Sequence, residues 1–192
     1  EAWSVTGNRW YKSVAERTAD YVLREMTSPE GAFCSAQDAD SQGREGAYYV
    51  FTPEDIREAL GREDGERFCL WYGITPDGNF EGGSIPNLID NPRFMEENDA
   101  MAALRKRVWD YRLQRMPLGL DDKVLTSWNA LMIAALCSAS RALERPDYLE
   151  AARKAEAFLN RRLTAEDGGL LLRYRDGEAK GGGVLADYAY LA

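Results

Sequence analysis

The sequence predicts a mainly helical protein in which helical units stack on one another and short β-hairpins connect them. Apolar residues recur at three- and four-residue spacing in the long segments, which is typical of amphipathic helices. A helix, a link and a strand also occur twice at one constant offset, which is typical of stacked repeats. The 192 residues include 45% hydrophobic and 29% charged residues, an ordinary composition for a globular domain with a sizeable core.

Seven segments carry helical periodicity or the residues that begin and end helices. Thr52 followed by Pro53 is a capping signal, and Gly61 ends the helix that they begin. The fourth segment is long and polar and stops at Pro117, whereas the fifth is the most apolar. In chain order, the segments are residues 9–26, 53–60, 68–72, 91–116, 127–143, 146–163 and 185–192.

Short strands are expected between these helices. Residues 32–35 and 47–51 flank an acidic loop and have the β-branched and aromatic character of strands. Residues 170–174 precede a turn signal at Asp176 and Gly177, which predicts a hairpin.

The repeated unit contains an amphipathic helix, a Thr-x-x-x-Gly link and a strand. Neither copy can bury its own apolar face, so each must stack on neighbours. Residues 1–3 match residues 138–140 at the tail of the apolar helix, and residues 185–192 begin another helix. We therefore expect a slice of a larger array. The matched residues are Tyr11, Ala15, Val22, Met26, Thr27, Gly31 and Phe33 with Tyr148, Ala152, Leu159, Leu163, Thr164, Gly168 and Leu170.

The composition excludes several classes of function. The chain has no histidine, so it contains neither a Ser-His-Asp or Cys-His triad nor a histidine-ligated zinc site. Its net charge of −8 argues against nucleic acid or an anionic membrane as partner, and no apolar run is long enough to span a bilayer. Cys34, Cys69 and Cys137 are widely spaced and odd in number, which indicates reduced thiols in a cytoplasmic protein. We expect neither a metal nor a cofactor.

The richest carboxylate segment is the loop from Asp38 to Glu45. Asp38 and Asp40 begin like an EF-hand calcium loop, but the twelfth position is Tyr49, where a glutamate is required. A looser oxygen-ligand site for calcium or magnesium stays open as an alternative. The simpler interpretation is that both aspartates bind turn amides.

A second polar group stands at the start of the most apolar helix. An indole beside an amide and two carboxylates suits a polyhydroxylated ligand, which needs a flat apolar platform and bidentate polar groups. The structural alternatives are that Thr126 or Ser127 caps the helix, that the aspartates complement its dipole, and that Trp128 packs in the core. The group consists of Asp121, Asp122, Lys123, Trp128 and Asn129.

Two further segments supply candidates. Asp187 and Tyr188 begin the last helix, so this helix entrance and that of Trp128 converge if the two helices are parallel neighbours. The glycine-rich segment 78–84 lacks the ending of a phosphate loop, but Glu81 can reach a cleft from it. The candidate catalytic residues are therefore Asp38, Asp40, Asp122 and Asp187, and the candidate ligand-binding residues are Glu45, Glu81, Asp121, Lys123, Trp128, Asn129 and Tyr188.

Four motifs resemble one known family. They are GAFCSAQDADSxGxEGAYYVFT from Gly31, GNFEG from Gly78, DDKVLTSWNALMIAAL from Asp121 and ADYA from Ala186. These motifs resemble the YyaL and spermatogenesis-associated protein 20 family over essentially the whole chain. Two positions depart from the family pattern: Ala130 stands where glycine is frequent, and Ala186 stands where an acidic residue is frequent.

The resemblance implies an incomplete (α/α) toroid over residues 1–192, similar to six-hairpin glycosidases and N-acylglucosamine 2-epimerases. Family members typically carry an N-terminal thioredoxin-like domain, which we expect to be absent from this chain, and we expect the toroid to be truncated at both ends. The resemblance also implies that helix entrances face a central cleft. This cleft would bring Asp122, Trp128, Asn129 and Asp187 together, and the loop from Asp38 could line the same opening.

Two kinds of function stay open at this point. The first is a carbohydrate-active or sugar-binding toroid, whose carboxylates could hydrolyse a glycosidic bond without histidine. A sugar 2-epimerase would need histidine bases from outside this chain. The second is a non-catalytic helical scaffold or binding module that acts with a thioredoxin-like domain, in which the acidic residues are caps and salt-bridge partners. A homo-oligomer is compatible with either function.

Overall fold

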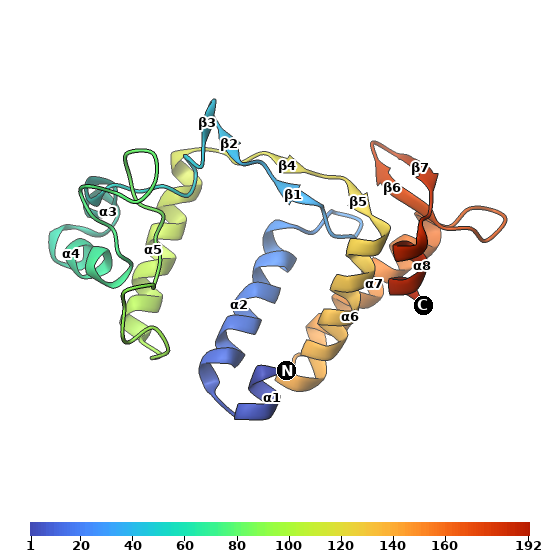
Figure 1. Ribbon diagram of the computed structural model, residues 1–192, viewed down its shortest axis with the longest axis horizontal. Helices are drawn as coiled ribbons and strands as arrows, with labels where there is room; N and C mark the ends of the chain where they lie inside the picture. Colours follow the sequence, from blue (N-terminus) through green and yellow to red (C-terminus); the bar gives the residue numbers. More distant parts are fainter. The chain divides into compact units, whose positions relative to one another are not determined.

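The computed structural model describes all residues from 1 to 192, and it confirms the mainly helical prediction (Figure 1). The chain divides into two compact units, residues 1–37 with 120–192 and residues 38–119. No helix combines the length and the apolarity that crossing a membrane requires. The helices are α1 (Ala2–Thr6), α2 (Arg9–Glu25), α3 (Pro53–Leu60), α4 (Arg62–Trp71), α5 (Asp99–Arg115), α6 (Thr126–Leu143), α7 (Pro146–Arg162) and α8 (Leu185–Leu191). The strands are β1 (Ala36–Gln37), β2 (Asp40–Ser41), β3 (Arg44–Glu45), β4 (Leu120–Asp121), β5 (Val124–Leu125), β6 (Leu171–Arg175) and β7 (Glu178–Gly182).

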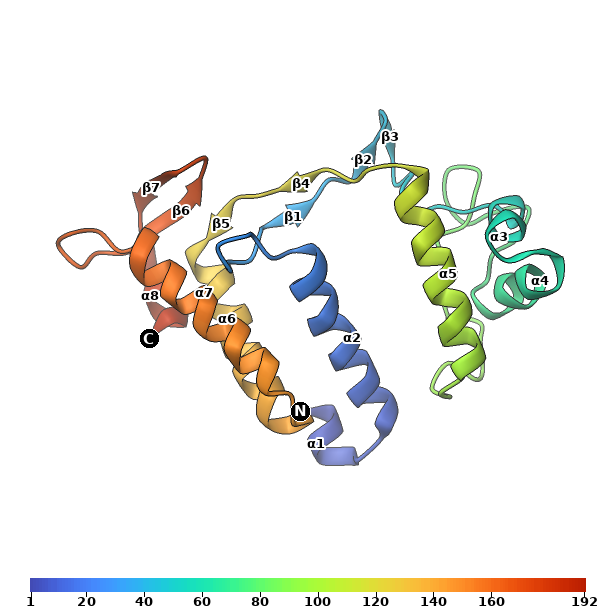
Figure 2. The same cartoon turned by 180° about the vertical axis from the view of Figure 1, so that it is seen from behind.

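The first unit is built on the helical hairpin of α6 and α7, which lie side by side (Figures 1 and 2). One apolar stripe of α7 is fully covered: Tyr148, Ala152, Ala155 and Leu159 are each at most 1% exposed. Their spacing of three and four residues places them on one face of the helix. Burial of a large apolar side chain contributes about 1.5–3 kcal/mol, so this stripe is a main source of the unit's stability.

The repeated unit predicted from the sequence is present in both copies, after α2 and after α7. Gly31 and Gly168 occupy the same place in the two links, and both have positive φ angles, 93° and 84°. The threonine that begins each link donates its hydroxyl to a carbonyl of the preceding helix. The short helix α1 matches the last turn of α6, because both end at a left-handed residue, Gly7 and Glu144. The bridges that close the two links join Thr27 to Phe33 and Thr164 to Leu170.

Short strands position the start of α6. β5 pairs antiparallel with β6, and β6 pairs with β7 through the hairpin predicted at Asp176 and Gly177. The register places Val124 opposite Tyr174 and Leu125 opposite Arg173. β4 pairs with β1, the two residues that follow the first link. The first residues of α6 are therefore held between the link after α2 and the β6–β7 hairpin.

The second unit packs α3, α4 and α5 around one apolar core, which includes Ile56, Phe68 and Leu104. The predicted capping signal is a complete capping box: the Thr52 hydroxyl accepts from the Asp55 amide, and the Asp55 carboxylate accepts from the Thr52 amide. Gly61 ends α3, as expected.

Two strand predictions were wrong. Residues 32–35 and 47–51 take part only in isolated bridges, and the strands β2 and β3 lie inside the acidic loop, where Asp40 pairs with Glu45. Residues 47–49 form turns because the Arg115 guanidinium binds the carbonyls of Ala47, Tyr48 and Val50, which a strand would have used for its ladder.

The polar segment from residue 91 becomes helical only at Asp99. The Asn98 side chain accepts a hydrogen bond from the Met101 amide and begins α5 there. The toroid itself stays a prediction, as does its extent as one domain over residues 1–192.

Candidate functional site

The start of α6 is the best-formed candidate site of the first unit, and its helix cap comes from another helix. Neither Thr126 nor Ser127 caps α6 with its side chain, contrary to one alternative drawn from the sequence. The Thr126 hydroxyl instead donates to the Leu171 carbonyl at 2.6 Å and ties α6 to β6. The Ser127 amide donates to Oδ1 of Asp187 in α8 at 2.9 Å.

Asp187 joins the first turns of α6 and α8. Its side chain is 0% exposed, and its second oxygen, Oδ2, accepts from the Val184 amide at 2.8 Å. A carboxylate at two helix N-termini is favoured both by the unpaired amides and by the helix dipoles. The structure thus brings the two helix entrances together. Both carboxylate oxygens of Asp187 accept hydrogen bonds from backbone amides there.

The Asn129 side chain also forms hydrogen bonds with backbone groups. It is 1% exposed; its Oδ1 accepts from the Phe33 amide at 2.8 Å, and its Nδ2 donates to the carbonyls of Phe33 and Leu125 at 2.9 and 3.0 Å. The side chain therefore substitutes for a strand partner of the link after α2. The Tyr188 hydroxyl accepts in the same way from the Leu170 amide, the counterpart of Phe33 in the second repeat, at 3.0 Å.

The Trp128 indole faces solvent at the start of α6. The residue is 56% exposed, although Asn129 and Ala130 beside it are buried, so the core-packing alternative for this indole is wrong. Leu131, one turn further along α6, is also 48% exposed. Tyr188 of α8 keeps 46% of its surface exposed even though its hydroxyl is bonded. An exposed indole on a well-anchored helix turn is available as a stacking platform.

The charged residues before α6 form ion pairs. Nζ of Lys123 lies 2.9 Å from Oδ2 of Asp121, and this contact lowers the pKa of the Asp121 carboxyl. Nε of Arg175 lies 2.9 Å from Oδ1 of Asp122, and Nη1 of Arg175 lies 3.9 Å from Oδ1 of Asp121. Arg175 stands at the end of β6 and is not among the site residues predicted from the sequence. The hairpin signal at Asp176 and Gly177 predicted where β6 ends, but the pairing of β6 with β5, which brings Arg175 to Asp122, joins segments about 50 residues apart and has no local signal.

The remaining candidates belong to the second unit. Asp38, Asp40 and Glu45 are exposed, and Asp40 lies opposite Glu45 in the β2–β3 pair. Like charges in this position repel each other. Glu81 is exposed and has a positive φ of 46°. No group of three or more cysteine or carboxylate side chains is arranged to hold a metal ion.

Cys34 follows the link after α2, is buried, and has a raised thiol pKa. Burial is the main cause, and the carboxylates of Asp122 and Asp121 add to it because they disfavour a thiolate. A group whose folded pKa is raised stabilises the fold below its unfolded pKa, and this contribution is lost as pH rises through the folded pKa. The thiol therefore favours the folded state at neutral pH and ceases to do so in alkaline solution.

We expect the Cys34→Ala variant to lose less stability than the wild type when the pH is raised from 8 to 10. Urea unfolding at several pH values measures this slope. Burial is also the main cause of the raised pKa of Cys69, so Cys69→Ala should reduce the alkaline loss in the same direction, and Cys34 in that variant should still alkylate slowly. Rapid alkylation of Cys34 in the folded protein at pH 7.5 would contradict the burial and the raised pKa of this thiol.

The fold and the site together define a mainly helical repeat protein with an exposed aromatic and charged helix entrance. No family model matches the chain. Spermatogenesis-associated protein 20 of Mus musculus is 27% identical over 207 residues, which cover 90% of this chain, and the Homo sapiens protein is 26% identical over the same share. An uncharacterized protein of Caenorhabditis elegans is 27% identical over 79% of the chain.

These similarities support the assignment of the chain to the YyaL and spermatogenesis-associated protein 20 family, as the motifs predicted. The chain spans only about a quarter of the length of these relatives: 26% of the mouse and human proteins and 25% of the Caenorhabditis elegans protein.

Proposed function

We propose that the entrance of α6 binds a small polyhydroxylated ligand of the sugar class. The exposed indole of Trp128 is the observation that carries this proposal. Sugars present apolar C–H faces and dense hydroxyl groups, so they are bound by a flat aromatic surface together with bidentate polar side chains. Trp128 offers the first, and the charged residues before α6 offer the second.

The polar partners would be Asp121, Asp122, Lys123 and Arg175. All four side chains are between 26% and 53% exposed, and they are held in place by ion pairs with one another. Paired charges in this position can exchange one of their contacts for a sugar hydroxyl without leaving a buried charge unpaired. Their strands are fixed by the pairing of β4 with β1 and of β5 with β6.

Binding has more support than hydrolysis. A glycosidase needs two free carboxyl groups, about 5–5.5 Å apart for retention or about 6.5–9.5 Å apart for inversion. In the first unit, Asp187 is buried on two backbone amides, and Asp121 and Asp122 are paired with Lys123 and Arg175. Catalytic roles for Asp38, Asp40, Asp122 and Asp187, like an epimerase that takes its bases from outside this chain, stay predictions.

The second candidate function is a non-catalytic helical scaffold. The observation that favours it is the use of Asn129 and Asp187, two of the most suggestive polar residues, to hold backbone segments together. In that case the entrance serves to connect successive helical units. A cytoplasmic location is also a proposal, supported by three cysteines that form no disulfide.

A thermal-shift screen of monosaccharides and short oligosaccharides on the whole chain tests the proposal. We expect at least one sugar to raise the melting temperature, and the Trp128→Ala variant to bind it about tenfold more weakly, which corresponds to ~1.4 kcal/mol. Leu131→Ala is the matched control, because Leu131 is exposed to a similar degree on the same helix. A sugar response that Trp128→Ala leaves intact would contradict this binding site, and the lack of any response across the screen would favour the scaffold.

A further inference from the structure

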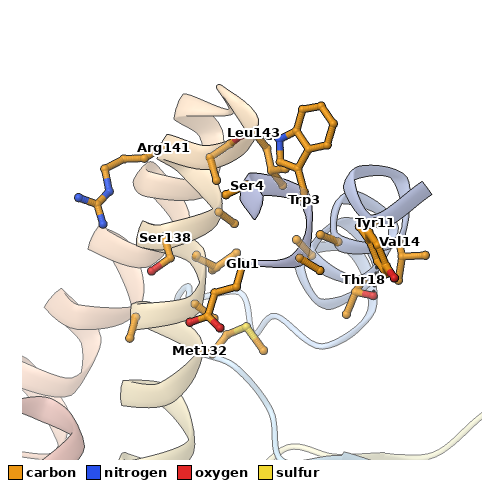
Figure 3. A pocket seen from close by; sticks show the side chains of 18 of the residues that line it. Glu1, Trp3, Ser4, Tyr11, Val14, Thr18, Met132, Ser138, Arg141 and Leu143 are labelled. Atoms are coloured by element: carbon orange, nitrogen blue, oxygen red, sulfur yellow. Dashed lines mark hydrogen bonds between the residues drawn. The ribbon is translucent and has the colours of Figure 1, made fainter. Parts of the chain in front are cut away.

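An open apolar groove lies between α2 and α6 and is closed at one end by α1 (Figure 3). Its volume is about 1210 Å³. At the closed end, the Trp3 indole donates to the Ala142 carbonyl and fastens α1 to the end of α6. The walls are made mostly of small or apolar side chains, among them Tyr11, Ala15 and Thr18 of α2 and Ala135 and Ser138 of α6.

The two repeats differ at this groove. In the second repeat, the stripe of α7 formed by Tyr148, Ala152 and Ala155 is at most 1% exposed. The matching positions of α2 are Tyr11, which is half-buried, and Ala15 and Thr18, which are exposed. The same helical face is therefore covered in one repeat and open in the other.

The buried face of α7 packs against α6, the helix that precedes it. Leu136 and Leu143 of α6 belong to the same buried cluster as Tyr148, Ala152 and Ala155, and Ile133 packs against it. For α2, the preceding helix is α1, which matches only the last turn of α6 and ends at the same left-handed residue. α1 is too short to cover Ala15 and Thr18.

The links show the order in which the units connect. The link after α2 is bound by Asn129 of α6, and the link after α7 is bound by Tyr188 of α8. α7 is thus covered by the helix before it and bound through its link to the helix after it. For α2, the helix after it is α6, and the groove lies where the helix before it would pack.

We propose that this groove is the seat of a further apolar helix of the α6 type, which lies between α2 and α6. Such a helix buries the faces of Ala15 and Thr18 in the way that α6 buries Ala152 and Ala155. Small residues on both walls allow its backbone to approach closely. The groove is in this view an internal packing surface of the helical array and not a ligand cavity.

The repeat defines the extension that tests this proposal. Ala2 is the counterpart of Ala139, so the residues that would precede Glu1 correspond to residues 130–137. A copy of residues 130–137 is therefore fused to the N-terminus of the whole chain, directly before Glu1. We expect the melting temperature of the extended chain to be roughly 4–8 °C higher, because the added helix buries a few apolar side chains of the groove. We also expect it to bind less of the dye 1-anilinonaphthalene-8-sulfonate, which reports exposed apolar surface. Both proteins should be monomeric in sedimentation.

Two controls make the result specific. In the first control, the two residues of the added segment that correspond to Ile133 and Leu136 are replaced by aspartate. This substituted extension should not raise the melting temperature. In the second, Ala15→Arg should cancel the gain in the extended chain but leave the unextended chain unchanged, whereas Ala157→Arg, an exposed position of α7, should do neither.

Three results would overturn the proposal. The first is an extension that does not stabilise the chain, and the second is an aspartate-substituted extension that stabilises it equally well. The third is an unextended chain that dimerises and loses its dimer on Ala15→Arg, since a second copy would then be the occupant.

Discussion

Replacing Asp187 by alanine is expected to destabilise the first unit by about 3 kcal/mol. The substitution leaves the amides of Ser127 and Val184 without their side-chain partner at two helix N-termini, and it removes a carboxylate that is itself 0% exposed. An unsatisfied buried amide costs about 1–3 kcal/mol, and the loss of a helix cap costs about 0.5–2 kcal/mol. Urea unfolding followed by circular dichroism measures the change in the free energy of unfolding.

The Asp187→Asn variant separates a structural role from a catalytic one. Asparagine keeps one carbonyl oxygen for the Ser127 amide but turns an NH₂ group toward the Val184 amide, so we expect about half of the loss seen with alanine. A residue whose main role were catalysis would tolerate this isosteric change with little loss of stability. An Asp187→Asn protein as stable as the wild type would therefore contradict the structural role.

Replacing Asn129 by aspartate is expected to destabilise the first unit by about 3–4 kcal/mol at neutral pH. The carboxylate can still accept from the Phe33 amide, but its other oxygen faces the carbonyls of Phe33 and Leu125, to which Nδ2 now donates. The site is 1% exposed, so the charge is also buried without a partner.

The effect of Asn129→Asp should depend on pH in a defined direction. The introduced carboxyl is favoured in its protonated form, which can donate to a carbonyl, so its pKa in the folded state is raised. A raised pKa stabilises the fold at low pH, and this is lost as pH rises. The stability deficit against the wild type should therefore grow from pH 4 to pH 7.

Tyr188→Phe is the matched control for Asn129→Asp. It removes the single hydroxyl contact to Leu170 at the corresponding place of the second repeat, where the side chain is partly exposed, and should cost only about 1 kcal/mol. An equal loss for both variants, or a pH-independent loss for Asn129→Asp, would mean that the amide network is not the cause.

The sequence was sufficient to predict most of the helical framework. The helices α2, α6 and α7 lie within one residue of their expected bounds, because apolar periodicity and capping residues are local signals. The repeat was also visible, since its link depends on a threonine and on a glycine with positive φ at fixed places. The lack of a strand at residues 47–51 was not predictable, because Arg115 binds the carbonyls of Ala47, Tyr48 and Val50 from a distant part of the sequence.

The candidate site was predicted as a set of residue types but not as an arrangement. Arg175 was missed, because its pairing with Asp122 depends on the register of β5 with β6. Asn129 and Trp128 are neighbours in the sequence, yet one is buried in a backbone network and the other faces solvent. No local pattern distinguishes them, since the 3.6-residue period assigns both to the first turn of an apolar helix.

The sequence by itself determined the helical class, the repeated unit and the lack of histidine in these 192 residues, because these depend on periodicity, link residues and composition. Only the tertiary structure decided which polar residues hold backbone segments together and which side chains stay exposed. The partners of Asn129 and Asp187 lie 96 and 60 residues away along the chain, so their roles could emerge only when distant backbone amides came into reach. The same packing leaves Trp128 exposed and makes it the residue on which the proposed sugar site depends.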